Sequence, residues 1–218
     1  MLLLKYHSTT TIPVEAECLT PDALAGKSAA EVAALPVQHG NAQAPLGEFF
    51  TAEGSADDGE VTVEGDCRRV KWIGAAMASG RLTVRGNAGM HLGAEMTGGE
   101  IHVEGDASDW VGAEMRGGRI HVHGSAGHLV GAAYRGSRSG MRGGVILVHG
   151  SAGNEIGAAM RRGLIAVGGD VGDFAGVSLI AGTVLLFWPA GRPPGRGHEA
   201  GQRRAVRGRA GAVAHVSL

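Results

Sequence analysis

A repeat of about nineteen residues constrains the fold of this chain more than any other feature. Each copy has the pattern Ile/Val/Leu-x-Val-x-Gly, then six residues, then Gly-Ala-x-Met-x-x-Gly. The copies begin at Val61, Leu82, Ile101, Ile120, Ile146, Ile165 and Val184, with spacings of 21, 19, 19, 26, 19 and 19 residues. Such a period is typical of stacked coils that share one elongated core.

The residues inside one copy predict its local structure. Apolar and polar residues alternate from Ile101 to Gly105, which predicts a strand with one buried face. A second short strand is expected over Val111–Met115, and glycine-rich turns separate the two. Nineteen residues leave no room for a helical crossover. The sequence therefore predicts an all-β fold, a right-handed parallel β-helix (a solenoid of ~19-residue coils) with a small α-containing N-terminal cap.

One column of the repeat is rich in methionine. Its members are Met77, Met96, Met115, Met141, Met160 and Leu179. Methionine fills irregular gaps in a core, so this column is expected to pack inside rather than to bind a metal or ligand.

Three segments are expected. Residues 1–45 form an N-terminal strand and helix cap, in which Thr20-Pro21 and the capping box Ser28-Ala-Ala-Glu31 each begin a short helix, the second running through Leu35. Residues 46–190 carry the repeats, and 191–218 form an irregular tail. For the tail, a disordered basic segment, a nucleic-acid arm and a frameshifted end remain open, because a one-base shift after His198 can restore the pattern of the repeat.

Composition gives no general reason to expect several classes of partner. The net charge is −1, which gives no reason to expect nucleic acid or an anionic membrane. The apolar start Met1–Leu4 is too short for a signal sequence or a membrane span. Cys18 and Cys67 lie far apart, so structural zinc and iron–sulfur clusters are unsupported and a cytoplasmic location is expected.

No motif for catalysis is recognisable. The sequence lacks the nucleophile elbow, the zinc-protease helix motif and the phosphate-binding loop. Glycine triplets such as Gly86, Gly89 and Gly93 recur in four copies without a following helix, so they indicate turn geometry rather than a dinucleotide site. We expect no catalytic residue and no cofactor bound by this chain.

Histidines in matching positions are the remaining candidates for a metal site. His102 and His121 share one outward column, and His123 and His149 share another, so each pair is close enough to share a ligand. The same columns contain Thr83, Leu147 and charged residues, which favours solvated or interface columns. No metal is therefore expected.

The 26-residue copy contains a seven-residue insertion between Gly131 and Met141. It should protrude as a loop that carries Arg135 and Arg138, with Arg142 at its end and Arg161 on the next repeat. Clustered guanidinium groups suit a carboxylate-rich ligand or an acidic partner surface. These four arginines are the predicted binding residues; an ordinary solvated loop is the alternative.

Three features together resemble one protein family over about residues 46–188. They are the repeated coils, the run Leu46-Gly-Glu-Phe-Phe50 leading into Val61-Thr-Val-Glu-Gly-Asp66, and the run Gly140-Met-Arg-Gly-Gly144. The chain is similar to the C subunit of formylmethanofuran dehydrogenase, and more specifically to the C subunit of the bacterial formyltransferase/hydrolase complex. More distantly, the coils resemble the C-terminal domain of the glutamate synthase large subunit.

The resemblance implies a structural subunit without its own active site, in tetrahydromethanopterin-linked one-carbon metabolism. Amidohydrolase-like and formyltransferase partners would do the chemistry, converting a formyl carrier to formate or CO2. Zinc, a molybdenum or tungsten pterin and a methanofuran-like carrier would belong to those partners. A glutamate-synthase-type scaffold for an amidotransferase is the first alternative, and a carbohydrate-active β-helix is the second.

Overall fold

The computed structural model describes residues 1–187 and 204–207 of the 218-residue chain. Its helices are α1 (Pro21–Leu24), α2 (Ala29–Ala33) and the 3₁₀ helix η1 (Leu46–Glu48). Its strands are β1 (Leu2–Tyr6), β2 (Val14–Glu15), β3 (Pro36–His39), β4 (Ala42–Pro45), β5 (Phe50–Gly54), β6 (Glu60–Glu64), β7 (Val70–Lys71), β8 (Arg81–Arg85), β9 (Glu100–Val103), β10 (Arg119–Val122), β11 (Arg142–Val148), β12 (Arg162–Val167), β13 (Thr183–Leu186) and β14 (Arg204–Arg207).

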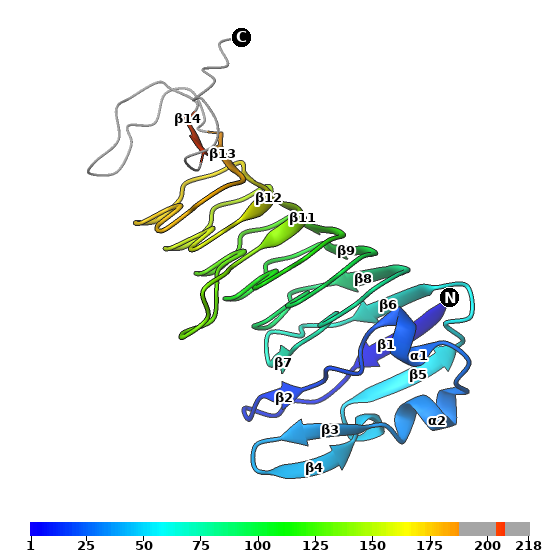
Figure 1. The fold of residues 1–218 in the computed structure, drawn as a ribbon. Helices are drawn as coiled ribbons and strands as arrows, with labels where there is room; N and C mark the ends of the chain where they lie inside the picture. The colour runs from blue at the N-terminus through cyan, green and yellow to red at the C-terminus, as the bar shows by residue number, and fades with distance from the viewer. Residues whose placement is uncertain (188–203, 208–218) are drawn as a thin grey trace.

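The main sheet follows the repeats. Its ten strands lie in the order β14-β13-β12-β11-β10-β9-β8-β6-β1-β5, and successive repeats stack along one direction (Figure 1). The strand pairs from β1 to β13 are parallel, and the first apolar residues of successive repeats are direct partners, as in Ile101, Ile120 and Ile146. The pairs β1–β5 and β13–β14 are antiparallel. The repeat boundaries expected from the sequence are confirmed by this register.

The second strand expected in each repeat is not formed. The segment from Val111 to Met115 consists of turns, because Gly112 and Glu114 have φ values of 60° and 53° that an extended strand does not allow. Elsewhere the repeats are joined by single bridges in a column of small residues, namely Cys67, Ala88, Ala107, Ala126, Ala152 and Val171.

The expected fold class is therefore wrong. The prediction was an all-β right-handed parallel β-helix with two strands in each coil. The structure is mostly β, with a mixed ten-stranded sheet, a separate four-stranded sheet in the order β4-β3-β2-β7, and a few short helices.

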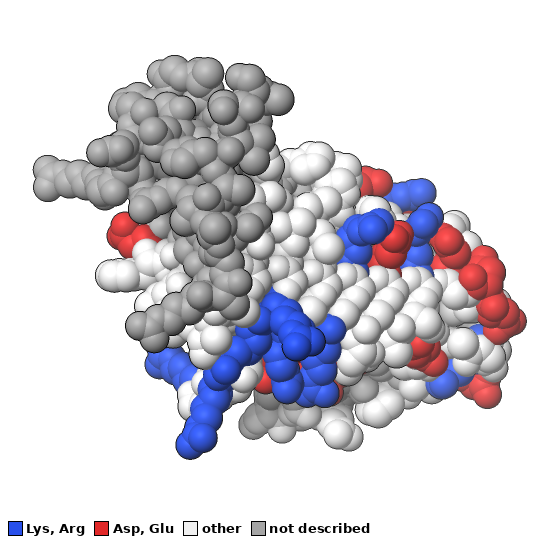
Figure 2. All heavy atoms as spheres, turned by 45° about the horizontal axis from the view of Figure 1, so that its top comes forward, with Lys and Arg blue, Asp and Glu red and all other residues white. Residues whose placement is uncertain are grey.

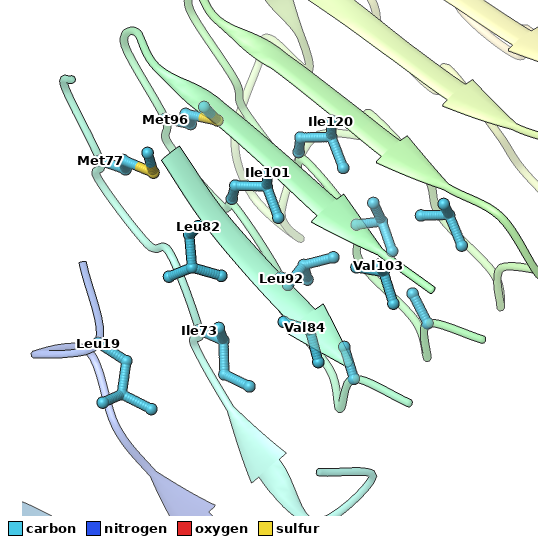
Figure 3. Close-up of a cluster of buried hydrophobic side chains, with 14 of the residues drawn as sticks. Leu19, Ile73, Met77, Leu82, Val84, Leu92, Met96, Ile101, Val103 and Ile120 are labelled. Atoms are coloured by element: carbon cyan, nitrogen blue, oxygen red, sulfur yellow. The ribbon is translucent and has the colours of Figure 1, made fainter. Parts of the chain in front are cut away.

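The methionine column lies in the core, as expected. Met77 is 1% exposed, and Met96, Met115, Met141 and Met160 are fully buried. Figure 3 shows Met77 and Met96 beside Leu82 and Ile101, which come from neighbouring strands. Leu179 is only partly buried against the same core.

The N-terminal segment supplies one strand to the main sheet. β1 lies between β5 and β6, while α1 and α2 begin at the expected caps. The Thr20 hydroxyl accepts a hydrogen bond from the Ala23 amide at 3.1 Å, and Ser28 and Glu31 form the reciprocal capping box. α2 ends at Ala33, two residues before the expected end.

The segment expected to be an irregular tail contains β14. The rest of that segment, including the proposed site of a frameshift, lies outside the described residues. No helix in the described part of the chain is long and apolar enough to cross a bilayer.

Candidate functional site

The inserted loop is held in place by Tyr134. Its backbone N–H donates to a Glu114 carboxylate oxygen at 3.2 Å, and its hydroxyl lies 3.1 Å from His91 Nδ1. At the far end of the loop the Gly140 amide donates to the Ala159 carbonyl at 3.0 Å. The loop is therefore tied at both ends to the turns of adjacent repeats.

An aromatic stack supports this loop. The rings of Trp72 and His91 are parallel with centroids 4.2 Å apart, and the Trp110 and Tyr134 rings stack at 5.0 Å. Trp72, His91 and Trp110 are spaced by nineteen residues and all have positive φ. Sequence reasoning missed this stack, although the shared repeat position was the signal that could have identified it.

Burial changes the titration of the stack. It is the main cause that lowers the pKa of His91, and the nearby Lys71 lowers this pKa further against the opposing effects of Glu15 and Asp109. Burial also raises the pKa of the Tyr134 hydroxyl, with Glu95 and Glu114 adding to the effect. Both side chains are therefore held in their neutral forms at neutral pH.

The lowered pKa of His91 predicts that acid weakens the fold. The His91 imidazole binds a proton more tightly in the unfolded chain than in the folded one. The stability that neutral His91 contributes is therefore present above the ordinary histidine pKa of about 6.5 and is lost as the pH falls below it. We expect the free energy of unfolding to fall less steeply between pH 7.5 and 5.5 in His91→Phe, which keeps a ring in the stack. Denaturant titrations across this range measure the two slopes, and equal slopes would contradict the assignment.

Three of the four predicted arginines, Arg138, Arg142 and Arg161, lie close together, and Arg135 is on the same loop as Arg138. Arg142 pairs in register with Arg162 across β11 and β12, and Arg161 donates from Nη2 to the Arg138 carbonyl at 2.9 Å. We call Arg135, Arg138, Arg142, Arg161 and Arg162 the arginine patch. Arg161 is half-buried and the other four are exposed.

The arginine patch carries excess positive charge. None of its five guanidinium groups has a carboxylate within ion-pair distance in residues 1–187, whereas nearby Arg116 pairs with Glu95 at 3.6 Å. The Arg161 Nε is buried and lacks a hydrogen-bond partner among the described atoms. Figure 2 shows basic side chains gathered in one area of the surface and intermingled with acidic side chains in another. The patch is suited to binding carboxylates.

Charges on the strands of the earlier repeats neutralise one another. Glu100 lies 3.0 Å from Arg119 and 3.3 Å from Arg81, and Glu64 lies 2.9 Å from Arg85. The hydrogen bond from His102 is the largest cause of the lowered pKa of Glu100, and the two arginines add to it. These exposed pairs contribute little stability, and they contrast with the arginine patch, whose guanidinium groups form no ion pair within residues 1–187.

The two predicted histidine pairs form one cluster. The His102 and His121 rings are 5.7 Å apart, and those of His123 and His149 are 5.1 Å apart. In addition, His121 Nε2 lies 2.8 Å from His149 Nε2, and its ring is 4.3 Å from that of His123. Burial is the first cause that lowers the pKa of His121, and the other three histidines add to it. The sequence predicted the two pairs, but it did not predict that they contact each other.

No known protein-family profile matches the chain. The C subunit of the molybdenum-containing formylmethanofuran dehydrogenase 1 is 44% identical over 85 residues in Methanosarcina barkeri and 47% identical over 82 residues in Methanothermobacter marburgensis. Each match covers 37% of this chain, but only 28% and 20% of the respective relative. The C subunit of the tungsten-containing enzyme 2 of Methanothermobacter thermautotrophicus is 43% identical over 85 residues, which cover 37% of this chain and 32% of that protein.

A solved structure matches far more of the chain. A chain of the formyltransferase/hydrolase complex from Methylorubrum extorquens, determined with methylofuran, superposes with a TM-score of 0.76 and 28% identity. The superposition covers 86% of this chain and 77% of that one. The expected resemblance to the C subunit is confirmed by these likenesses, whereas the more distant link to glutamate synthase finds no support in them.

Proposed function

From its likeness to the C subunits of formylmethanofuran dehydrogenases, we propose that this chain is a structural subunit of a related assembly of several different chains. The observation that carries the proposal is the match to a chain of the formyltransferase/hydrolase complex over 86% of the present chain. The repeats give such a subunit a long rigid sheet, because each of their strands is paired on both sides. A scaffold needs this rigidity to hold several partners in fixed positions.

The complex would act in one-carbon metabolism by converting a formyl carrier to formate or CO2. We assign the chemistry to amidohydrolase-like and formyltransferase partners, with zinc or a molybdenum or tungsten pterin held by them. The two cysteines of this chain suit a metal cofactor poorly, because burial raises the pKa of Cys18 to about 11 and that of Cys67 to about 12. Thiolate ligands are therefore disfavoured at both positions.

Purification from the native host tests this role. The chain with a removable tag is expected to retain formyltransferase and amidohydrolase partners through size-exclusion chromatography, identified by mass spectrometry. Recovery of the chain alone, under conditions where those partners are present in the lysate, would contradict the proposal.

The arginine patch is the proposed contact with an acidic partner surface or with the carboxylates of the carrier. Its guanidinium groups form no ion pair with a carboxylate in residues 1–187, and the inserted loop holds two of them on an anchored support. A binding partner with carboxylates would remove this imbalance, and bidentate guanidinium pairs would fix its orientation.

Charge reversal in the arginine patch should weaken assembly. Because like charges at an interface cost several kcal/mol, we expect Arg135→Glu/Arg138→Glu to lower partner or carrier affinity at least about tenfold. Arg68→Glu/Arg69→Glu is the matched control, since these two exposed arginines lie outside the patch. Pull-down with graded salt measures the effect, and equal retention by both double variants would exclude the patch as the contact.

A further inference from the structure

The four clustered histidines project from the outer face of the main sheet. His102 lies between the buried Ile101 and Val103, and Val122 is fully buried between His121 and His123. Because side chains alternate along a strand, the histidines point away from the core. The His123 amide donates to the Val103 carbonyl and the His149 amide to the Val122 carbonyl, both at 2.9 Å. These hydrogen bonds fix the backbone on both sides of β10.

The ring nitrogens are close enough to share one ion. One ligand atom from each of His102, His121 and His123 lies within 4.8 Å of the other two, and His149 Nε2 is 2.8 Å from His121 Nε2. Two imidazole nitrogens on a tetrahedral zinc ion, at about 2.0–2.1 Å from the metal, are about 3.3 Å apart. Metal binding would therefore require side-chain rotations that bring the nitrogens to this separation.

We propose that His102, His121 and His123 bind one divalent transition-metal ion, with His149 as the fourth ligand. Imidazole ligands favour zinc, nickel or copper over calcium and magnesium, which prefer oxygen. A carboxylate oxygen of Glu100 lies 3.5 Å from His102 Nε2, where it can orient that ring in the way that outer carboxylates orient metal-bound histidines.

The cluster differs from the solvated columns expected from the sequence. Thr83 and Leu147, which share a column with His102 and His121, interrupt the histidines along the sheet. The second column supplies His123 and His149 at the same place, so the rings of His121, His123 and His149 converge across both columns. The His102 ring lies beside that of His121, with the centroids 5.7 Å apart. All four positions are set by paired strands or by residues next to them, and a bound ion would link β9, β10 and β11.

Metal titration of the full chain tests the proposal. After tag removal and chelator treatment, calorimetry with Zn²⁺, Ni²⁺ and Cu²⁺ should show one ion per chain for at least one of them, and Cu²⁺ should give an electron paramagnetic resonance spectrum with nitrogen couplings. Loss of a direct ligand exceeds the roughly 10–100-fold effect of losing an outer partner, so His121→Ala should weaken binding more than about 100-fold.

The matched control is His7→Ala, which removes an exposed histidine outside the cluster and should leave binding unchanged. His123→Ala provides a second variant, and circular dichroism verifies that each variant is folded. The metal should also raise the unfolding temperature of the wild type but not of His121→Ala. Absence of saturable binding of all three ions, or unchanged affinity in folded His121→Ala and His123→Ala, would overturn the proposal.

Discussion

Gly118→Ala is expected to lower the free energy of unfolding by about 3–5 kcal/mol, whereas Gly136→Ala costs only about 1–2 kcal/mol. Both glycines have a left-handed backbone, with φ of 83° and 88° respectively, so both substitutions introduce the same strain. The two sites differ in the room that they leave for an added Cβ. A Cβ at Gly118 would lie 2.8 Å from the carbonyl oxygens of Gly98 and Gly99, while nothing lies within 4 Å of one at Gly136.

The difference between these variants measures how tightly the repeats stack. The obstructing carbonyls belong to the backbone of the preceding repeat, and the amide of Arg119 donates to the Gly99 carbonyl at 3.0 Å. Relief of the clash must therefore stretch or break the pairing of β9 with β10. Guanidinium unfolding of both variants provides the test, and equal losses of stability would mean that backbone strain alone explains the glycine.

Met115→Ala is expected to cost about 2–5 kcal/mol, because it leaves a cavity in a core that relaxes only partly. The Met115 side chain is fully buried, and the turn that carries it is held on each side. The Arg116 amide donates to the Met96 carbonyl, and the Arg142 amide donates to that of Met115 at 2.7 Å. Neighbouring repeats are thus fixed in place and cannot move inward to fill the space.

Met115→Leu is the matched control. It conserves most of the volume and the apolar character, so its cost should stay below about 1.5 kcal/mol. Thermal and guanidinium unfolding of the two variants give the comparison. A loss below about 1 kcal/mol for Met115→Ala would mean that the methionine column is not a close-packed part of the core.

The sequence predicted those parts of the fold that depend on spacing. The apolar alternation located the strands and their register, because Ile101 and Ile120 are equivalent in the repeat and become direct partners. The Ser28 capping box was recognisable because its hydrogen bonds are local. The prediction of a second strand over Val111–Met115 was wrong because Glu114 adopts a positive φ, which is uncommon for residues other than glycine.

The candidate sites were less predictable for a related reason. The position within the repeat identified neighbours along one column, and this was enough to predict that His102 lies beside His121. Contacts between columns depend on side-chain rotation, so the approach of His121 to His149 became visible only in three dimensions. The antiparallel pairing of β5 and β14 at the two ends of the sheet likewise has no counterpart in the repeat pattern.

The serial order of the strands also limits how the length of this chain can change. Duplication of one nineteen-residue unit between β12 and β13 would lengthen the sheet and leave every side-chain cluster intact. Insertion of a unit without these side chains directly after β9 would instead separate His102 from His121 and His91 from Trp110. Homologous chains of different length should therefore differ toward the ends of the stack, with the repeats from β8 to β12 kept as an uninterrupted block.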